Sequence, residues 1–507
     1  MKIKRKFLKT SPFEKNMPIS TMEDVYGKKY HYRRWRKRFL TYLLILALIL
    51  IATIIVSCTV GPDYTRPVFF EDKTLEKVLN LKPTEDNSGL VPFDFQDDVL
   101  TRLLREGRQN SPSIRIALAK VRQSRAYVKI SETDLMPTAD INAAYHYLNA
   151  GDNMGLYDDE NYYQSAIDMS WEIDIFGSNR RRLESAGANL SGMIENLKNI
   201  YITLDANIAT QYIQLRTAEQ LLTNAEHNLK IQTQIYETVS DQYEAGLAGE
   251  IALNQAKYLV ETTRMSLPQL QFSRTQAQNA LALLVGKLPT QLNDDLSRQK
   301  TNLIQQPFSY DLKRLYNLPV SVIRNRPDVR VAEERLIAQN ALVGAAIADM
   351  FPNVSISGLL GFGALKLPDL ANSDSAQYGI TPQISVPLFH FGALKNNVAV
   401  QKAIKDEYLI SYENTLLTAA SEINNALAAL ETEKSRNLSA KTAYDKTKEV
   451  SALNWQKYRQ GLIEYADVLD AEQRRLSAQT DMVNSNAALY RNIISYYKAI
   501  GSQLITP

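Results

Sequence analysis

Two aspartates three positions apart are the clearest candidates for chemistry in this sequence. Asp467 and Asp470 lie shortly after Gly461, and an i, i+3 spacing places both carboxylates on one face of a helix. Carboxylates gathered around a passage attract cations and hinder anions. The same pair could instead be two exposed side chains that favour a helix N-terminus through its dipole, and the spacing alone does not separate these interpretations.

Few other residues offer chemistry. The 507 residues include one cysteine and four histidines, which excludes a disulfide framework and a Cys-rich zinc site. We expect His146 to be solvated rather than to hold a metal. The glycine-rich stretch 358–363 differs in spacing from a dinucleotide fingerprint and opens no helix. The sequence therefore predicts no enzyme, no metal and no cofactor.

The charge of the chain is concentrated at its N-terminus. Residues 1–57 contain 13 of the 58 Lys and Arg and 3 of the 55 Asp and Glu. The remaining 45 basic and 52 acidic residues give residues 58–507 a net charge of about −7. A nucleic-acid-binding body, which is basic as a rule, is therefore not indicated.

Residues 1–57 have the order of an export signal. A long basic segment precedes an apolar run over 39–56, and a small residue, Ser57, stands before Cys58. The stretch 55–58 resembles a bacterial lipobox, which predicts that Cys58 carries covalent lipid, and Thr59 favours the outer membrane. A permanent membrane helix is the alternative, since about 18–20 apolar residues can span a bilayer.

The remainder of the chain repeats itself with an offset of 215 residues. We predict an N-terminal lipid-anchored segment over 58–96, a first repeat over 97–286, a connector over 287–326, a second repeat over 327–501 and a tail over 502–507. Identical residues 215 positions apart support the repeat: Pro112 and Pro327, Phe176 and Phe391, Gly177 and Gly392, Tyr243 and Tyr458, Gly246 and Gly461.

Four segments alternate between apolar and polar residues, which is typical of strands. They cover about 138–148, 163–175, 353–363 and 378–389, a length suited to tilted membrane strands. Pro382 should mark a strand edge or a bend, because it cannot donate a hydrogen bond. Four strands cannot close a barrel, so membrane strands imply two or three chains. A soluble sandwich with one wet face is the alternative.

The rest of each repeat predicts unusually long helices. No glycine interrupts residues 393–460, and 68 helical positions would form a rod of roughly 100 Å. We expect each rod to turn near Gly246 or Gly461, because glycine suits the left-handed conformation that ends a helix, and a second helix to return. An elongated coiled-coil scaffold without a pore would show the same pattern.

Five stretches, in this order, resemble the TolC-like outer membrane efflux proteins, in the lipoprotein branch called the NodT or OprM type. Together they cover nearly all of residues 58–500. The resemblance implies a homotrimer with a twelve-stranded outer-membrane β-barrel, a continuous twelve-helix periplasmic α-barrel and a mixed equatorial belt. The stretches are 58–67 (CTVGPDYTRP), 318–330 (LPVSVIRNRPDVR), 351–355 (FPNVS), 386–389 (VPLF) and 461–470 (GLIEYADVLD).

The same resemblance implies the function and the partners. The chain would be the exit duct of a tripartite efflux pump in the bacterial outer membrane, lipid-anchored through Cys58, passively conducting drugs or other small molecules. It would work with a periplasmic adaptor (a membrane fusion protein) and an inner-membrane pump of the RND class. Two alternatives are the outer-membrane component of a type I protein secretion system and a lipid-anchored coiled-coil adaptor without a pore.

The resemblance also assigns residues to the periplasmic mouth. Asp467 and Asp470 would form a ring of six carboxylates, and Tyr243 and Tyr458 match tyrosines of the helix tips. Certain members carry a charged latch of Arg and Asp where this chain has Ile463 and Ala252. Glu250 is close by in sequence. We therefore expect a hydrophobic or tyrosine-based closure of the mouth instead of a salt-bridged lock.

Overall fold

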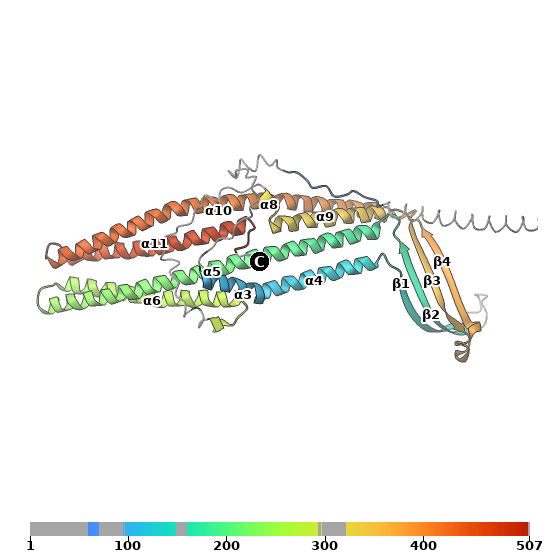
Figure 1. Cartoon of the computed structure of the whole chain (residues 1–507), viewed down its shortest axis with the longest axis horizontal. Helices are drawn as coiled ribbons and strands as arrows, with labels where there is room; N and C mark the ends of the chain where they lie inside the picture. Colours follow the sequence, from blue (N-terminus) through green and yellow to red (C-terminus); the bar gives the residue numbers. More distant parts are fainter. Residues whose placement is uncertain are drawn as a thin grey trace, which may run out of the picture. The chain divides into compact units, whose positions relative to one another are not determined.

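The structure is a computed structural model that describes residues 59–69, 95, 97–148, 160–289, 291–292, 296 and 321–504 (Figure 1). Cys58, the expected signal peptide and most of the expected connector lie outside the described residues. The chain divides into two compact units. The first contains Leu135–Arg180 and Ile347–His390, and the second contains Pro62–Asp134, Arg181–Ala346 and the chain from Phe391 onward.

The first unit is a four-stranded antiparallel sheet in the order β1-β2-β3-β4. β1 (Thr138–Leu148) and β3 (Asn353–Ala364) lie where the alternation places them, and β2 (Glu160–Ile173) begins earlier than expected. The strand expected to reach residue 389 is wrong at its end, because β4 is Ala376–Ser385. Pro387 follows closely and has no N–H to extend the ladder.

The strand registers carry the 215-residue offset. β1 pairs with β2 so that Thr138 faces Ser170, and β3 pairs with β4 so that Asn353 faces Ser385. Each residue of the second pair is 215 positions beyond its counterpart in the first. Pro382 lies inside β4, opposite Ile356, on an outer strand of the sheet, which is where a strand proline is tolerated.

The two faces of the sheet differ in chemistry. One face exposes large apolar side chains: Ile141, Tyr145, Tyr147, Met169, Trp171, Leu360, Phe362, Tyr378, Ile380 and Ile384. The other face carries Asp140 directly opposite Asp168. The amide of Asn142 donates to Asp168 at 2.7 Å, and that of Asn353 donates to Glu172 at 2.6 Å. None of the four strands contains Lys or Arg.

The helices of the two repeats correspond residue for residue. α4 (Pro112–Thr133) and α9 (Pro327–Ala348) have 22 residues each. α5 (Ser178–Glu244) and α10 (Ala393–Arg459) have 67, and α6 (Glu250–Leu284) and α11 (Tyr465–Ala499) have 35. Each later helix begins 215 residues after its counterpart. None of the helices that the structure describes is both long enough and apolar enough to cross a membrane.

The core of the second unit lies between these helices and the short helices α3 (Asp98–Asn110) and α8 (Ser321–Arg324). Asp97 caps α3 by accepting from the Leu100 N–H at 2.9 Å, and its other oxygen accepts from the Tyr212 hydroxyl at 2.7 Å. The core includes several fully buried large side chains: Leu100, Tyr212, Leu281, Tyr412 and Tyr496.

Candidate functional site

The long helical hairpins turn at two equivalent glycines. Gly246 and Gly461 have φ of 72° and 69°. In both turns the N–H of the following leucine donates five residues back, from Leu247 to Gln242 at 2.7 Å and from Leu462 to Lys457 at 3.0 Å. This hydrogen bond is typical of a glycine-terminated helix. Both sequence-predicted turn residues therefore lie at the ends of the hairpins.

We expect Gly461→Ala to lower the free energy of unfolding by about 1–2 kcal/mol, because an L-residue strains at positive φ. A new methyl group would meet nothing within 4 Å, so the effect isolates backbone conformation. Gly187, inside α5, also has nothing within 4 Å, and Gly187→Ala should stabilise the protein by about 0.5–1 kcal/mol. Denaturant unfolding of both variants measures the contrast, and equal effects would contradict it.

An aromatic cluster holds the second turn. Tyr458 lies 5.9 Å from Trp455 and 5.6 Å from Tyr465 between ring centroids, and all three rings meet edge to face. Burial raises the pKa of the Tyr458 hydroxyl, and burial together with nearby Tyr458 and Glu472 raises the pKa of Tyr465 to about 12. Both rings therefore stay neutral and pack as apolar groups at physiological pH.

The two predicted tip tyrosines have different surroundings. The Tyr458 hydroxyl donates to Oε1 of Gln242 at 3.2 Å and so connects α10 with α5. The side chain of Tyr243 is 41% exposed. In the part of the chain that the structure describes, no side-chain hydrogen bond of Tyr243 is observed. Only Tyr458 therefore links the two hairpins within one chain.

The two predicted mouth carboxylates are exposed on the first turns of α11. Between them Val468 is buried against Val239 and Tyr465. The Asp470 carboxylate accepts from Nε of Arg474 at 2.8 Å, whereas Asp467 has no charged partner among the described residues. The sequence interpretation missed Arg474, although its i, i+4 spacing from Asp470 is a recognisable signal. Asp467 therefore contributes the less compensated negative charge.

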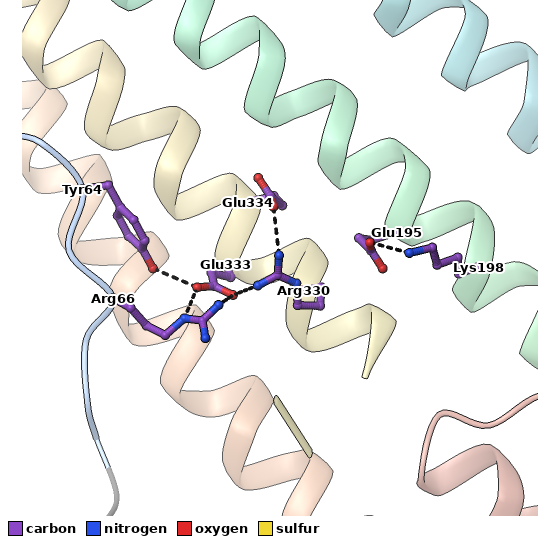
Figure 2. A network of polar contacts seen from close by, with 7 residues as sticks. All are labelled: Tyr64, Arg66, Glu195, Lys198, Arg330, Glu333 and Glu334. Atoms are coloured by element: carbon purple, nitrogen blue, oxygen red, sulfur yellow. Dashed lines mark hydrogen bonds and ion pairs between the residues drawn. The ribbon is translucent and has the colours of Figure 1, made fainter. Parts of the chain in front are cut away.

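A second polar site binds the segment that follows Cys58. The carboxylate of Glu333 on α9 accepts from both Nε and Nη2 of Arg66 and from the Tyr64 hydroxyl at 3.3 Å (Figure 2). Arg330 donates to the same carboxylate at 2.5 Å. The Glu333 side chain is 2% exposed. Burial, with the Glu333 charge as the next cause, raises the pKa of the Tyr64 hydroxyl, so Tyr64 remains a donor.

The same segment has two further attachments in the second unit. The backbone oxygen of Pro62 accepts from the buried Asn340 amide at 2.9 Å, and Asp63 accepts from Arg181 at 2.8 Å. The Arg181 side chain is 5% exposed. Residues 62–66 therefore provide partners for three buried polar side chains. The sequence motif was recognised, but these contacts were not foreseen.

The sequence profile of the family described as outer membrane efflux protein matches residues 103–287 and 318–502, more than half of the chain. The chain belongs to this family. The two matched ranges begin 215 residues apart, which is the internal offset of the sequence. As in other outer membrane efflux proteins, the apolar face of the sheet belongs to the membrane part and the helical hairpins to the periplasmic part.

Individual relatives agree with the family assignment. The solvent efflux pump outer membrane protein SrpC of Pseudomonas putida is 32% identical over 80% of this chain and 86% of its own length. The cation efflux system protein CusC of Escherichia coli K12 is 27% identical over 89% of this chain and 97% of its own length. The protein is thus an outer-membrane channel that serves as an exit duct for efflux.

Solved structures show the same architecture. The outer-membrane channel OprN is 30% identical and covers 88% of this chain and 99% of its own, with a TM-score of 0.79. A structure of CusC described for its transmembrane channel formation is 26% identical over 88% of this chain and all of its own, with a TM-score of 0.75.

Within this efflux protein, the positions of the family's charged latch are apolar. Ala252 and Ile463 are partly buried and pack against the tip cluster of Val239, Tyr465 and Val468. Glu250 is exposed in the first turn of α6. The described tip is therefore held by apolar and aromatic packing around Tyr465, with the Tyr458–Gln242 hydrogen bond beside it.

Proposed function

We propose that three copies of the chain close a twelve-stranded membrane barrel that continues into a tunnel of twelve helices, with a mixed belt around it. The sheet itself is the observation that carries this proposal. It has one exposed apolar face and two open outer strands, and an open strand edge is not tolerated in lipid. Barrels have eight or more strands, so four strands require further copies.

We propose that the duct passively conducts cations and uncharged small molecules and catalyses no reaction. Asp140, Asp168 and Glu172 on the polar strand face, where Lys and Arg are absent, favour cations over anions. Asp467 adds negative charge at the hairpin turns. Names of the relatives point the same way, since they describe efflux of solvent, of toluene and of cations.

The proposed partners are a periplasmic adaptor of the membrane fusion class, an inner-membrane pump of the RND class and outer-membrane lipid, with covalent lipid on Cys58 and no other cofactor. Relatives named as parts of efflux pumps support an external energy source. An adaptor without a pore would leave the membrane strands unexplained. Deleting the gene and comparing the export of solvents, metal cations and proteins tests the function, because lost protein export alone would favour type I secretion.

The proposed closure of the periplasmic mouth is formed by the aromatic and apolar tip cluster. Tyr458 supplies a hydrogen bond between hairpins, and the more exposed Tyr243 would serve at the boundary with the next copy. Asp467 and Asp470 would form the carboxylate ring at the same end. Repulsion between these carboxylates would favour opening, and packing around Tyr465 would oppose it.

We expect Asp467→Asn with Asp470→Asn to lower the cation-to-anion permeability ratio by roughly tenfold at low salt, because a ring of one charge concentrates counterions. Asp467→Asn alone should cause most of the loss, since Arg474 already offsets Asp470. The effect should vanish near 1 M salt, where the Debye length is about 3 Å.

Planar-bilayer recording measures this ratio. Asp406→Asn, an equal charge change at an exposed position near the opposite end of α10, is the matched control and should leave the ratio unchanged. An unaltered ratio in the double variant, or an equal fall in the Asp406 control, would remove the carboxylate ring from the proposed mechanism.

A further inference from the structure

The outer strands of the sheet have edges that no described strand covers. β1 and β4 are the two ends of the strand order. Every residue of β4 is exposed, and so is every residue from Thr138 to Tyr147 of β1 except His146. An outer strand presents a row of backbone donors and acceptors that must be paired in lipid. The partner of each edge is therefore another strand.

The internal repeat indicates which strand that is. β3 is the equivalent of β1, and β4 is the equivalent of β2, because each begins in step with the 215-residue offset. The chain already contains one junction between repeats, β2 with β3, where Ser170 faces Ser357 and Met169 faces Gly358. The junction that would close the ring is its counterpart, β4 of one copy with β1 of the next.

The repeat also fixes the register. Moving Ser170 forward by 215 gives Ser385, and moving Ser357 back by 215 gives Asn142. The adjacent pair becomes Ile384 and Ala143. We infer that β4 pairs antiparallel with β1 of the next copy, with Ser385 opposite Asn142 and Ile384 opposite Ala143. This inference rests on the proposed assembly of copies and adds its contact surface and register.

The side chains match in this register. On the apolar face, Ile384 would lie opposite Ala143, and Ile380 opposite Tyr147. On the polar face, Ser385 would lie opposite Asn142, where Asn142 already donates to Asp168. Because strand side chains alternate, a slip of one residue would bring Ile384 against Asn142 and turn one strand's apolar side chains toward the polar face. The derived register therefore keeps both faces continuous.

Paired cysteines test this register in the full-length protein, whose one native cysteine is Cys58. Asn142→Cys with Ser385→Cys, and Ala143→Cys with Ile384→Cys, should form disulfides between copies under mild oxidation and give covalent dimers and trimers on non-reducing gels. Of two consecutive antiparallel pairs, one is of the closer kind, so at least one of these variants should cross-link efficiently.

The equivalent internal junction calibrates the test. Ser170→Cys with Ser357→Cys, and Met169→Cys with Gly358→Cys, should form disulfides within one copy, measured as lost thiol labelling without a gain in mass. Asn142→Cys with Gln383→Cys is displaced by two residues and should not cross-link, because diagonal neighbours lie about 7–8 Å apart and a disulfide requires Cβ atoms at about 4 Å.

The inference is overturned if the displaced pair or Ser385→Cys alone cross-links instead, or if the internal pairs close and neither pair between copies does. Closure of neither internal pair would overturn the sheet register on which it rests. The native mass of the same sample separates this result from the proposed function. A three-copy mass with the wrong cross-link leaves the channel intact, whereas a single-copy mass removes the assembly.

Discussion

Replacing both arginines that pair with Glu333 is expected to lower the free energy of unfolding by about 3–5 kcal/mol, the cost of leaving a buried charge without a partner. The Glu333 side chain is 2% exposed and accepts hydrogen bonds from Arg66 and Arg330. Arg66→Met or Arg330→Met alone leaves one arginine in place. Each single variant should therefore lose much less than half of that amount.

This non-additivity separates a charge network from ordinary packing. Adding Glu333→Gln to the double variant removes the buried charge and should recover most of the lost stability. Arg436→Met, at a largely exposed arginine of α10, is the control for loss of a surface ion pair and should cost less than about 1 kcal/mol. Equal and additive effects of the two single variants in denaturant unfolding would contradict the network.

The Glu333 network also shows what the residue pattern could not predict. Arg66 and Glu333 are 267 positions apart, and neither alternation nor helical periodicity links residues over such a distance. The Gly-Pro-Asp-Tyr motif was recognised only through a resemblance. Its physical purpose becomes clear from burial, because Asn340, Arg181 and Glu333 are all enclosed in the second unit and need polar partners.

The regular elements were far more accessible to sequence reasoning. Periods of two and of three to four residues located the strands and the long helices, because the burial of one face is repeated along each element. The end of β4 was missed where apolar residues continue past Pro387, since alternation does not register a missing N–H. At the mouth, the pattern located Asp467 and Asp470, but the compensation of Asp470 by Arg474 required coordinates.

A second buried ion pair should show a pH signature of its own. Asp205 on α5 is fully buried, and Arg108 on α3 donates to it at 2.5 and 3.1 Å. Burial raises the pKa of the Asp205 carboxyl, while Arg108 and the backbone N–H of Leu504 oppose that rise. Arg108→Met should cost about 3–5 kcal/mol near neutral pH, because the carboxylate loses its charged partner.

The sign of the pH dependence follows from the raised pKa. A carboxyl whose pKa is higher in the folded chain than its ordinary value of 3.8 binds protons more tightly when folded. Its contribution to stability is therefore fully present below pH 3.8 and is lost as the pH rises through the folded pKa. Without Arg108 that pKa rises further, so the deficit of Arg108→Met should narrow steadily as the pH falls from neutral.

Asp205→Asn in the Arg108→Met background tests this explanation. It removes the group that titrates, so the deficit should become smaller at neutral pH and should no longer change between neutral and acidic conditions. Denaturant unfolding of the original protein and both variants across that pH range measures the effect. If the deficit of Arg108→Met stays constant with pH, the loss comes from the packing of the arginine stem and its 5.9 Å contact with the Tyr201 ring, and the buried carboxylate is not its cause.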